Sequence, residues 1–279
     1  MHRKLNICGA LVVILTVAPA RGVADLVDVA NAVRSQGCGE LSAVDQPLRA
    51  RTQLDEAARR IANGDGLEAA TSGSGYRVKK SASIHIRTTK GDDGVAQMLT
   101  QRFCGIVTDS NLHEIGVYRR GEETWMVLAA PFSPPDPDDA STVSHRVLEL
   151  INEARLYTRR CGRKKFPATM PLKQVAALES AALAHAQDMA AHNYIGHKGS
   201  DGSTPADRAT RANYTWSSVA ENVAAGQTTA EEVVNTWLAS PGHCANLMRP
   251  RYSDTGVAYA VNPAGEKGIY WVQVFAAQE

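Results

Sequence analysis

His197-Lys-Gly-Ser-Asp-Gly-Ser203 is the first of three short stretches that decide the fold, followed by Ala220-Glu-Asn-Val223 and Trp237-Leu-Ala-Ser-Pro-Gly-His243. They carry two histidines and one glutamate beside glycine or turn residues, which suits convergence in one polar cleft. Neutral imidazoles and a carboxylate are also ligands that a divalent transition metal such as zinc binds. The three stretches therefore indicate where a site would lie without naming its chemistry.

The start of the chain has the pattern of an export signal. A charged Met1-His-Arg-Lys4 precedes an apolar run from Leu5 to Ala18, and small residues follow at Ala18-Pro-Ala20 and Val23-Ala24. The apolar run is shorter than the ~20 residues that span a membrane, and this order of segments is typical of a cleaved signal peptide. We therefore expect residues 1–24 to be removed. We also expect an exported protein, periplasmic or secreted, with no transmembrane segment in the mature chain.

The overall charge gives no support to a polyanion-binding role. The chain has 30 Lys and Arg residues against 29 Asp and Glu residues, with a formal net charge of +1. Proteins that bind nucleic acid usually neutralise several phosphates with clustered basic side chains. We therefore expect no nucleic-acid partner.

The chain repeats itself on either side of Ser133-Pro-Pro-Asp-Pro-Asp-Asp139, whose proline and acidic residues predict an extended linker over 133–141. Three features recur in the same order: an Asn-x-x-Arg segment before a cysteine, a second cysteine twelve residues before a glycine, and a closing Trp-containing run that predicts a strand. The matching stretches are Asn31–Arg34 with Asn152–Arg155, Cys104–Gly116 with Cys244–Gly256, and Thr124–Leu128 with Tyr270–Val274. The sequence thus predicts an internal duplication, with domains at 25–132 and 142–279. Coincidence between two ordinary α/β segments is the alternative.

Export makes the cysteine count informative. Four cysteines remain after the predicted signal peptide, an even number that favours disulfides in an oxidising compartment. Because each predicted copy holds two of them at matching places, we expect the bridges Cys38–Cys104 and Cys161–Cys244. The alternative is four free buried thiols.

The second copy predicts a layered α/β domain. Apolar spacing indicates helices at 142–157, 172–192 and 229–239, followed by two or more strands. Ser240-Pro-Gly-His243 is interpreted as a helix stop and turn. Helices of this kind pack over an antiparallel sheet.

Four motifs between about Val143 and Ala277 resemble the bacterial branch of the CAP superfamily, which holds the cysteine-rich secretory proteins, antigen 5 and the pathogenesis-related type 1 proteins. The motifs are His-x-Gly-Ser-Asp-Gly, Glu-Asn-Val-Ala, Trp-x-x-Ser-Pro-Gly-His-x-x-Asn and Tyr-Trp-x-Gln-Val-Phe. The resemblance implies an α-β-α sandwich with a cleft formed by His197, Glu221 and His243. With the duplication, we expect this sandwich twice, the first copy degenerate.

The resemblance also implies a possible metal site, with one departure from the pattern. In many members a second glutamate completes a tetrad that can hold zinc or another divalent ion, three residues after the tryptophan. Counted from Trp237, that position here is Ser240, which we expect to line the cleft with the other three residues. Serine is a poor zinc ligand beside carboxylate. We therefore expect no obligatory cofactor, and a divalent metal such as zinc is the ion that His197, Glu221 and His243 could hold.

We expect the cleft to bind a ligand rather than to catalyse a reaction. If Glu221 is a metal ligand, no second acid is evident to take a proton. The expected partners are a lipid, a cell-envelope component or an extracellular protein. Two alternatives are a divalent-metal-dependent hydrolase with Glu221 as general base between His197 and His243, and an extracellular interaction module with a vestigial cleft. The three residues could also simply hydrogen-bond one another to stabilise loops.

The first copy lacks each of the predicted cleft residues. Phe103 precedes Cys104 where His243 precedes Cys244, and counting from the matching tyrosine places Ser83 opposite Glu221. We therefore expect a structural, regulatory or partner-binding role for this copy.

Overall fold

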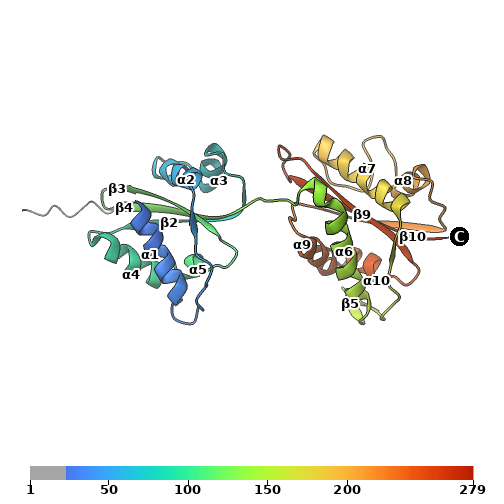
Figure 1. Cartoon of the computed structure of the whole chain (residues 1–279), viewed down its shortest axis with the longest axis horizontal. Helices are drawn as coiled ribbons and strands as arrows, with labels where there is room; N and C mark the ends of the chain where they lie inside the picture. The colour runs from blue at the N-terminus through green and yellow to red at the C-terminus, as the bar shows by residue number, and fades with distance from the viewer. Residues whose placement is uncertain (1–22, 279) are drawn as a thin grey trace, which may run out of the picture. The chain divides into compact units, whose positions relative to one another are not determined.

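The computed structural model describes residues 23–278, which form two compact units that divide between Phe132 and Ser133 (Figure 1). Residues 1–22 of the predicted signal peptide lie outside the described residues. Among residues 23–278, every helix is too short or too polar to cross a membrane.

The N-terminal unit has helices on both faces of a four-stranded sheet (Figure 1). One face carries α1 (Val23–Gln36), α4 (Gly91–Arg102) and α5 (Cys104–Val107). The other face carries α2 (Thr52–Ala62) and α3 (Leu67–Gly73). The strands lie in the order β1 (Arg49–Ala50), β3 (Glu114–Arg120), β4 (Glu123–Pro131) and β2 (Val78–Arg87).

The C-terminal unit has the same three layers. Its sheet has the order β7 (Lys173–Gln174), β9 (Asp254–Val261), β10 (Ile269–Ala277) and β8 (Ser218–Ala225). One face is covered by α7 (Ala176–His192) and α8 (Pro205–Arg211), and the other by α6 (Ala140–Arg155), α9 (Ala230–Ala239) and α10 (Pro241–Met248). A short hairpin of β5 (Arg159–Cys161) and β6 (Lys164–Phe166) follows α6. The α-β-α sandwich predicted from the sequence is confirmed.

Strand alternation explains why both faces of each sheet need a helical cover. In β4, Trp125 and Val127 pack with α2 and α3, whereas Met126 and Leu128 pack in the core that includes α1. Successive side chains of a strand point to opposite faces, so a strand that is apolar throughout must be buried on both. A central strand of this composition is stable only between two layers of helices.

The two units share details beyond strand order. In each sheet the short first strand runs parallel to its neighbour, and the other pairings are antiparallel. A fully buried arginine lies in the last turn of the first α-helix of each unit. Arg34 donates to the carbonyls of Gln46, Val107, Asp109 and Leu112, and Arg155 donates to those of Met170, Leu247, Arg249 and Tyr252. Each guanidinium thereby ties several loop carbonyls together at the end of a helix.

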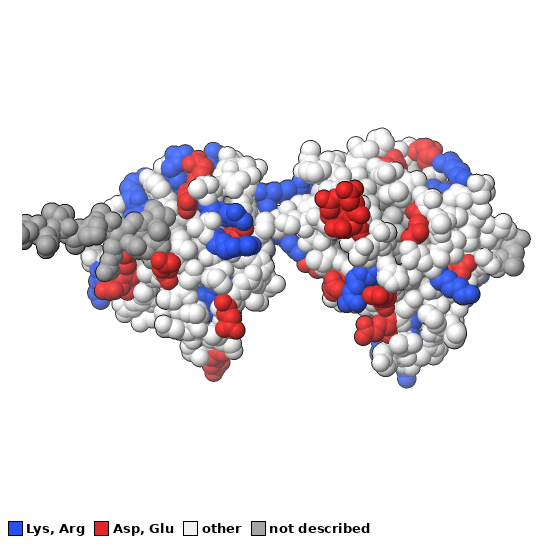
Figure 2. All heavy atoms as spheres, viewed as in Figure 1, with Lys and Arg blue, Asp and Glu red and all other residues white. Residues whose placement is uncertain are grey.

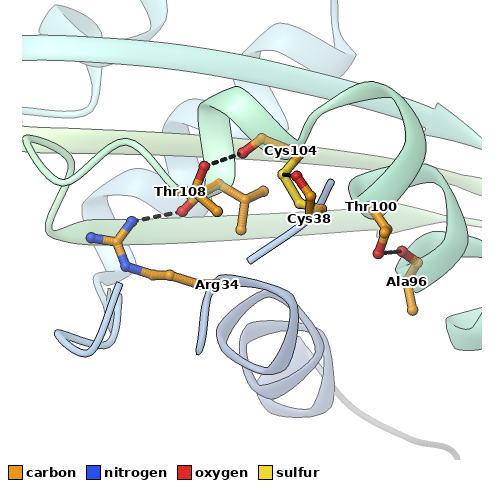
Figure 3. Close-up of a disulfide and its surroundings, with 7 residues drawn as sticks. Arg34, Cys38, Ala96, Thr100, Cys104 and Thr108 are labelled. Atoms are coloured by element: carbon orange, nitrogen blue, oxygen red, sulfur yellow. Dashed lines mark hydrogen bonds between the residues drawn. A yellow bond between two sulfur atoms is a disulfide. The ribbon is translucent and has the colours of Figure 1, made fainter. Parts of the chain in front are cut away.

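Both predicted disulfides are present. Cys38–Cys104 joins the turn after α1 to the start of α5, close to Arg34 (Figure 3). Cys161–Cys244 joins the β5–β6 hairpin to α10 in the same way. Each bridge lies within one unit and closes a long stretch of chain, which restricts the unfolded state.

Two helices of the C-terminal unit were not predicted. The segment between α7 and β8 contains α8, which begins at Pro205 with a capping box between Thr204 and Asp207. Ser240-Pro-Gly-His243 does end α9, but it also begins α10, with Pro241 in the first turn. Proline is favoured there because the first N–H groups of a helix have no intrahelical partner. The predicted end of α9 is therefore correct, whereas the start of α10 was not predicted.

Candidate functional site

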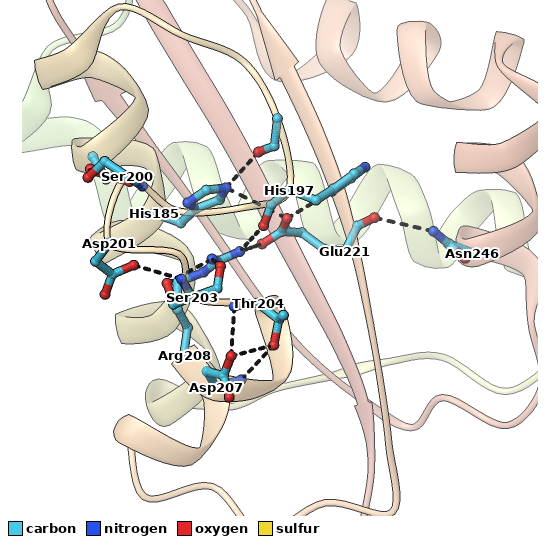
Figure 4. A network of polar contacts seen from close by, with 12 residues as sticks. His185, His197, Ser200, Asp201, Ser203, Thr204, Asp207, Arg208, Glu221 and Asn246 are labelled. Carbon is cyan, nitrogen blue, oxygen red and sulfur yellow. Dashed lines mark hydrogen bonds and ion pairs between the residues drawn. The ribbon is translucent and has the colours of Figure 1, made fainter.

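Glu221 lies at the centre of a polar network on β8 (Figure 4). Its side chain is 1% exposed, and its two oxygens have different partners. Oε1 lies 2.9 Å from Nδ1 of His197, and Oε2 accepts from Nη2 of Arg208 at 2.7 Å. A carboxylate this deeply buried requires charged or hydrogen-bonding partners to offset its lost hydration. The network supplies both.

Arg208 joins the loop that carries His197 to the sheet. Its guanidinium donates to the carbonyls of Ser203 and His197, each at 3.0 Å, in addition to Glu221. The capping box at the start of α8 places Arg208 one turn into that helix. The side chain is only 6% exposed. Arg208 is therefore a buried cross-link between the 197–203 loop and β8.

His185 approaches the same carboxylate from α7. It is fully buried, its Nε2 lies 2.7 Å from the carbonyl of Gly196, and the same nitrogen lies 3.8 Å from Oε1 of Glu221. The carbonyl is an acceptor, so Nε2 carries the proton. Burial lowers the pKa of His185, which favours this neutral form. His192 lies about two turns further along the same helix. It is exposed and pairs with Asp188 instead.

His243 reaches the site from α10. Asn222 donates to the carbonyl of His243, and Asn246 donates to the carbonyl of Glu221, so that α10 is fastened to β8. Nδ1 of His243 is buried and has no hydrogen-bond partner among the described residues. Such an atom is a candidate contact for a ligand, water or ion.

The pKa values of His197 and His243 are shifted in opposite directions. The hydrogen bond to Glu221 raises the pKa of His197 above its ordinary value of 6.5, although burial opposes this. Burial, with a further contribution from His197, lowers the pKa of His243. Between the two values His197 carries a charge and His243 is neutral. One imidazole is thus a donor at both nitrogens while the other keeps a free acceptor.

We expect NMR titration to find the pKa of His197 above 6.5 and that of His243 below it. Glu221→Gln should lower the pKa of His197, since the bond that holds its proton is weakened. A raised folded-state pKa stabilises the fold below 6.5 and loses that effect as pH rises through the folded value. The lowered pKa of His243 has the opposite consequence: its stabilising contribution is present above pH 6.5 and is lost as pH falls through the folded-state value. Equal values for both histidines in the wild type would contradict the described geometry.

If a divalent ion bound here, the two imidazoles rather than Glu221 would be its side-chain ligands. No three His, Cys, Asp or Glu side chains of residues 23–278 form a metal-binding group. Both oxygens of Glu221 are held by Arg208 and His197. A carboxylate bound to one ring nitrogen orients an imidazole and leaves its other nitrogen for a metal. His197 and His243 would therefore hold the ion, with Glu221 behind His197.

Ser240 lies where α9 gives way to α10 and is half buried. Among the described residues, no hydrogen bond joins its hydroxyl to His197, Glu221 or His243. The structure thus joins His197 to the Glu221 side chain and ties the backbone of His243 to β8 through Asn222.

A cavity of about 460 Å³ lies next to this network, between α7 and α8. Its wall includes His185 and Arg208, the two groups that pack behind Glu221, together with the 200–203 loop. Neither Arg208 nor the inward position of His185 was predicted. A capped helix start at Thr204 was the available signal for α8, but nothing in the sequence separates Arg208 from an ordinary surface arginine.

Comparison with known proteins agrees with these motifs. The sequence model of the cysteine-rich secretory protein family, CAP, matches residues 148–275. A curated relative, the protein YkwD of Bacillus subtilis (strain 168), is 33% identical over 139 residues, or 50% of this chain and 49% of the relative. The chain therefore spans about half the length of the curated relative it matches.

Solved structures also share similarity with the chain. An extracellular protein containing an SCP domain from Bacillus anthracis has a TM-score of 0.43 at 19% identity, covering 59% of this chain and 56% of that one. An outer surface protein from Borrelia burgdorferi has a TM-score of 0.39 at 22% identity, covering 51% and 95%. Over residues 148–275, within the C-terminal unit, the chain thus matches the model of the cysteine-rich secretory protein family, CAP.

Proposed function

We propose that this chain is an exported CAP-domain protein that binds a ligand, without turning it over, at a cleft formed by His197 and His243. The observation that carries the proposal is the buried Nδ1 of His243, which has no partner within the described residues. Beside it, the His197 side chain is 54% exposed and is oriented by Glu221. A preformed pair of imidazoles, one accessible and one unsatisfied, suits recognition of a polar group.

The arrangement around Glu221 argues against its use as a general base. A base must be free to take a proton from water or substrate within hydrogen-bond reach. Here one oxygen of Glu221 faces Arg208 and the other faces His197, and the carboxylate is buried. Binding is therefore favoured over metal-dependent hydrolysis.

Export and the pair of disulfides support one another. Disulfides persist in oxidising compartments and are rare in the cytosol. All four cysteines of residues 23–278 are bridged. Together with the apolar Leu5–Ala18 segment, this supports a periplasmic or secreted protein.

We also propose that the N-terminal unit is a degenerate CAP copy, joined to the second by the Pro- and Asp-rich segment 133–139, since α6 already begins at Ala140. The common strand order, the buried Arg34 and Arg155, and one disulfide in each unit support this descent. Strand register adds a specific correspondence. Ser83 pairs with Val127 next to Gly116, as Glu221 pairs with Val274 next to Gly256. Serine there cannot replace the carboxylate, so this copy would keep the scaffold without the cleft.

The test compares the purified wild type with the variant His197→Ala/His243→Ala by native mass spectrometry and by titration with zinc. We expect a bound lipid or cell-envelope fragment in the wild type that the variant loses. Zinc uptake that depends on both histidines would add a metal to the same cleft. The matched control is His85→Ala/His145→Ala, which removes two exposed histidines outside the site and should retain the ligand.

Three outcomes would contradict the proposal. A wild type that holds no ligand and takes up none from added lipid or envelope extract would favour a vestigial cleft. A ligand that survives in the double variant would place binding elsewhere. Zinc-dependent ester or amide hydrolysis that is lost in Glu221→Gln would favour the hydrolase.

A further inference from the structure

The β5–β6 hairpin concentrates basic charge on one end of the C-terminal unit. Arg160, Arg163, Lys164 and Lys165 are exposed, and none of them forms an ion pair with a described residue. No acidic residue occurs between Glu153 and Glu179 in the sequence. Elsewhere, on the face shown in Figure 2, Lys and Arg are interspersed with Asp and Glu. A near-neutral protein thus carries one local cationic surface.

Large apolar side chains flank this hairpin. Leu156 is 59% exposed, Tyr157 is 66% exposed and Met170 is 78% exposed, which makes them half of the six large hydrophobic residues exposed in the described chain. Nε of Arg155 donates to the carbonyl of Met170 at 2.7 Å, which holds Met170 near the end of α6 where Leu156 and Tyr157 follow. Exposed apolar groups gathered at one place usually mark an interaction surface.

The fold of the unit does not require basic and apolar residues in the segment after its first helix. In the N-terminal unit the corresponding turn after α1 holds the same kind of disulfide and the same kind of buried arginine. Yet no Lys or Arg occurs between Arg34 and Arg49, and Glu40 and Asp45 lie there instead. The fold can therefore be built with an acidic turn at this point. The basic and apolar character of the 156–170 segment needs another explanation.

We propose that this segment, here called the basic hairpin surface (residues 156–170), docks the protein on an anionic lipid bilayer. Cations near a negative bilayer are attracted by its surface potential, while exposed apolar groups enter the boundary between headgroups and acyl chains. Both kinds of group are exposed within residues 156–170. A soluble polyanion would need the cations alone and would leave Leu156, Tyr157 and Met170 unused, so the bilayer is the better fit.

The disulfide gives this surface a rigid base. Cys161 lies within the hairpin and is bonded to Cys244 of α10, and Phe166 packs with both cysteines and Met248. Lys164 lies over the ring of Phe166, with Nζ 5.0 Å from the ring centroid. Charges held on a stapled hairpin lose less conformational freedom on docking than charges on a mobile tail.

The test is co-sedimentation of the purified protein, its N-terminus defined by mass spectrometry, with phosphatidylcholine vesicles containing about 30% phosphatidylglycerol. We expect binding that weakens with added salt. The variant Arg163→Gln/Lys164→Gln/Lys165→Gln should bind on the order of 10- to 100-fold more weakly, since each cation contributes near the surface. The control Arg87→Gln/Lys90→Gln/Arg102→Gln changes net charge equally in the N-terminal unit and should bind as the wild type does.

A second pair of variants tests the apolar component. Leu156→Ser/Met170→Ser should bind the same vesicles about 5-fold or more weakly, because less apolar surface leaves water. Leu41→Ser/Leu183→Ser removes exposed leucines elsewhere and should have no effect. Unchanged disulfide content and circular dichroism would show that each variant is folded.

Several results would overturn the docking proposal. One is equal binding to vesicles of phosphatidylcholine alone, and another is wild-type binding by the triple hairpin variant. A third result combines normal vesicle binding by Leu156→Ser/Met170→Ser with loss of dextran sulfate binding by the triple hairpin variant. The surface would then be a site for soluble polyanions. His197→Ala/His243→Ala should still bind vesicles, so failure of the cleft and failure of the hairpin can be told apart.

Discussion

Arg208→Met is expected to lower the free energy of unfolding of the C-terminal unit by about 3–5 kcal/mol, because it leaves a buried carboxylate without its charged partner. Glu221 is 1% exposed, and the guanidinium accounts for one of its two oxygens. The same substitution removes one of two hydrogen bonds to the carbonyl of Ser203, which also accepts from the backbone N–H of Gly199. Denaturant unfolding followed by tryptophan fluorescence would measure the loss.

The neighbouring Arg211 provides the control. It lies on the same helix and pairs with Asp201, but its side chain is 60% exposed. Arg211→Met should therefore cost under about 1 kcal/mol. The double variant Arg208→Met/Glu221→Met should recover part of the stability lost in Arg208→Met, since no unpaired charge remains. A double variant less stable than the sum of the two single changes would contradict a buried pair.

Gly256→Ala should destabilise the same unit by about 3 kcal/mol or more. A Cβ at this position of β9 would lie 2.1 Å from the backbone nitrogen of Glu179 and equally close to the carbonyl carbon of Leu178. Backbone atoms at the start of α7 cannot rotate away as a side chain can. The helix would have to lift from the sheet, and thermal unfolding would report this as a lower melting temperature.

Two comparisons make the glycine prediction specific. A Cβ on Gly242 in α10 would meet no atom within 4 Å, so Gly242→Ala should be neutral or slightly stabilising. Gly116 in β3 approaches Leu54 and Asp55 as Gly256 approaches α7, so Gly116→Ala should destabilise the N-terminal unit instead. If Gly256→Ala unfolds like the wild type, the close approach of α7 to β9 is wrong.

The sequence predicted what depends on order along the chain. The repeat of cysteines around matching glycines was enough to pair Cys38 with Cys104 and Cys161 with Cys244. Alternation in the Trp-containing runs was enough to predict the central strands. Such features are local, or recur twice, and the second occurrence acts as a check on the first.

The remaining features depend on contacts between distant segments. Arg208 is an arginine on a short helix, and only the folded chain shows that it is buried against Glu221. Ser240 was included among the cleft residues by counting from Trp237, and the structure places it at the junction of α9 and α10.

Neither disulfide crosses the boundary between Phe132 and Ser133. A single cut by a protease in the Pro- and Asp-rich stretch that follows would therefore separate the chain into two pieces with no covalent connection, even without a reductant. Each piece would keep its own disulfide and its own buried arginine, Arg34 in one and Arg155 in the other. One half could then be shed, exchanged or lost in evolution while the other kept its shape.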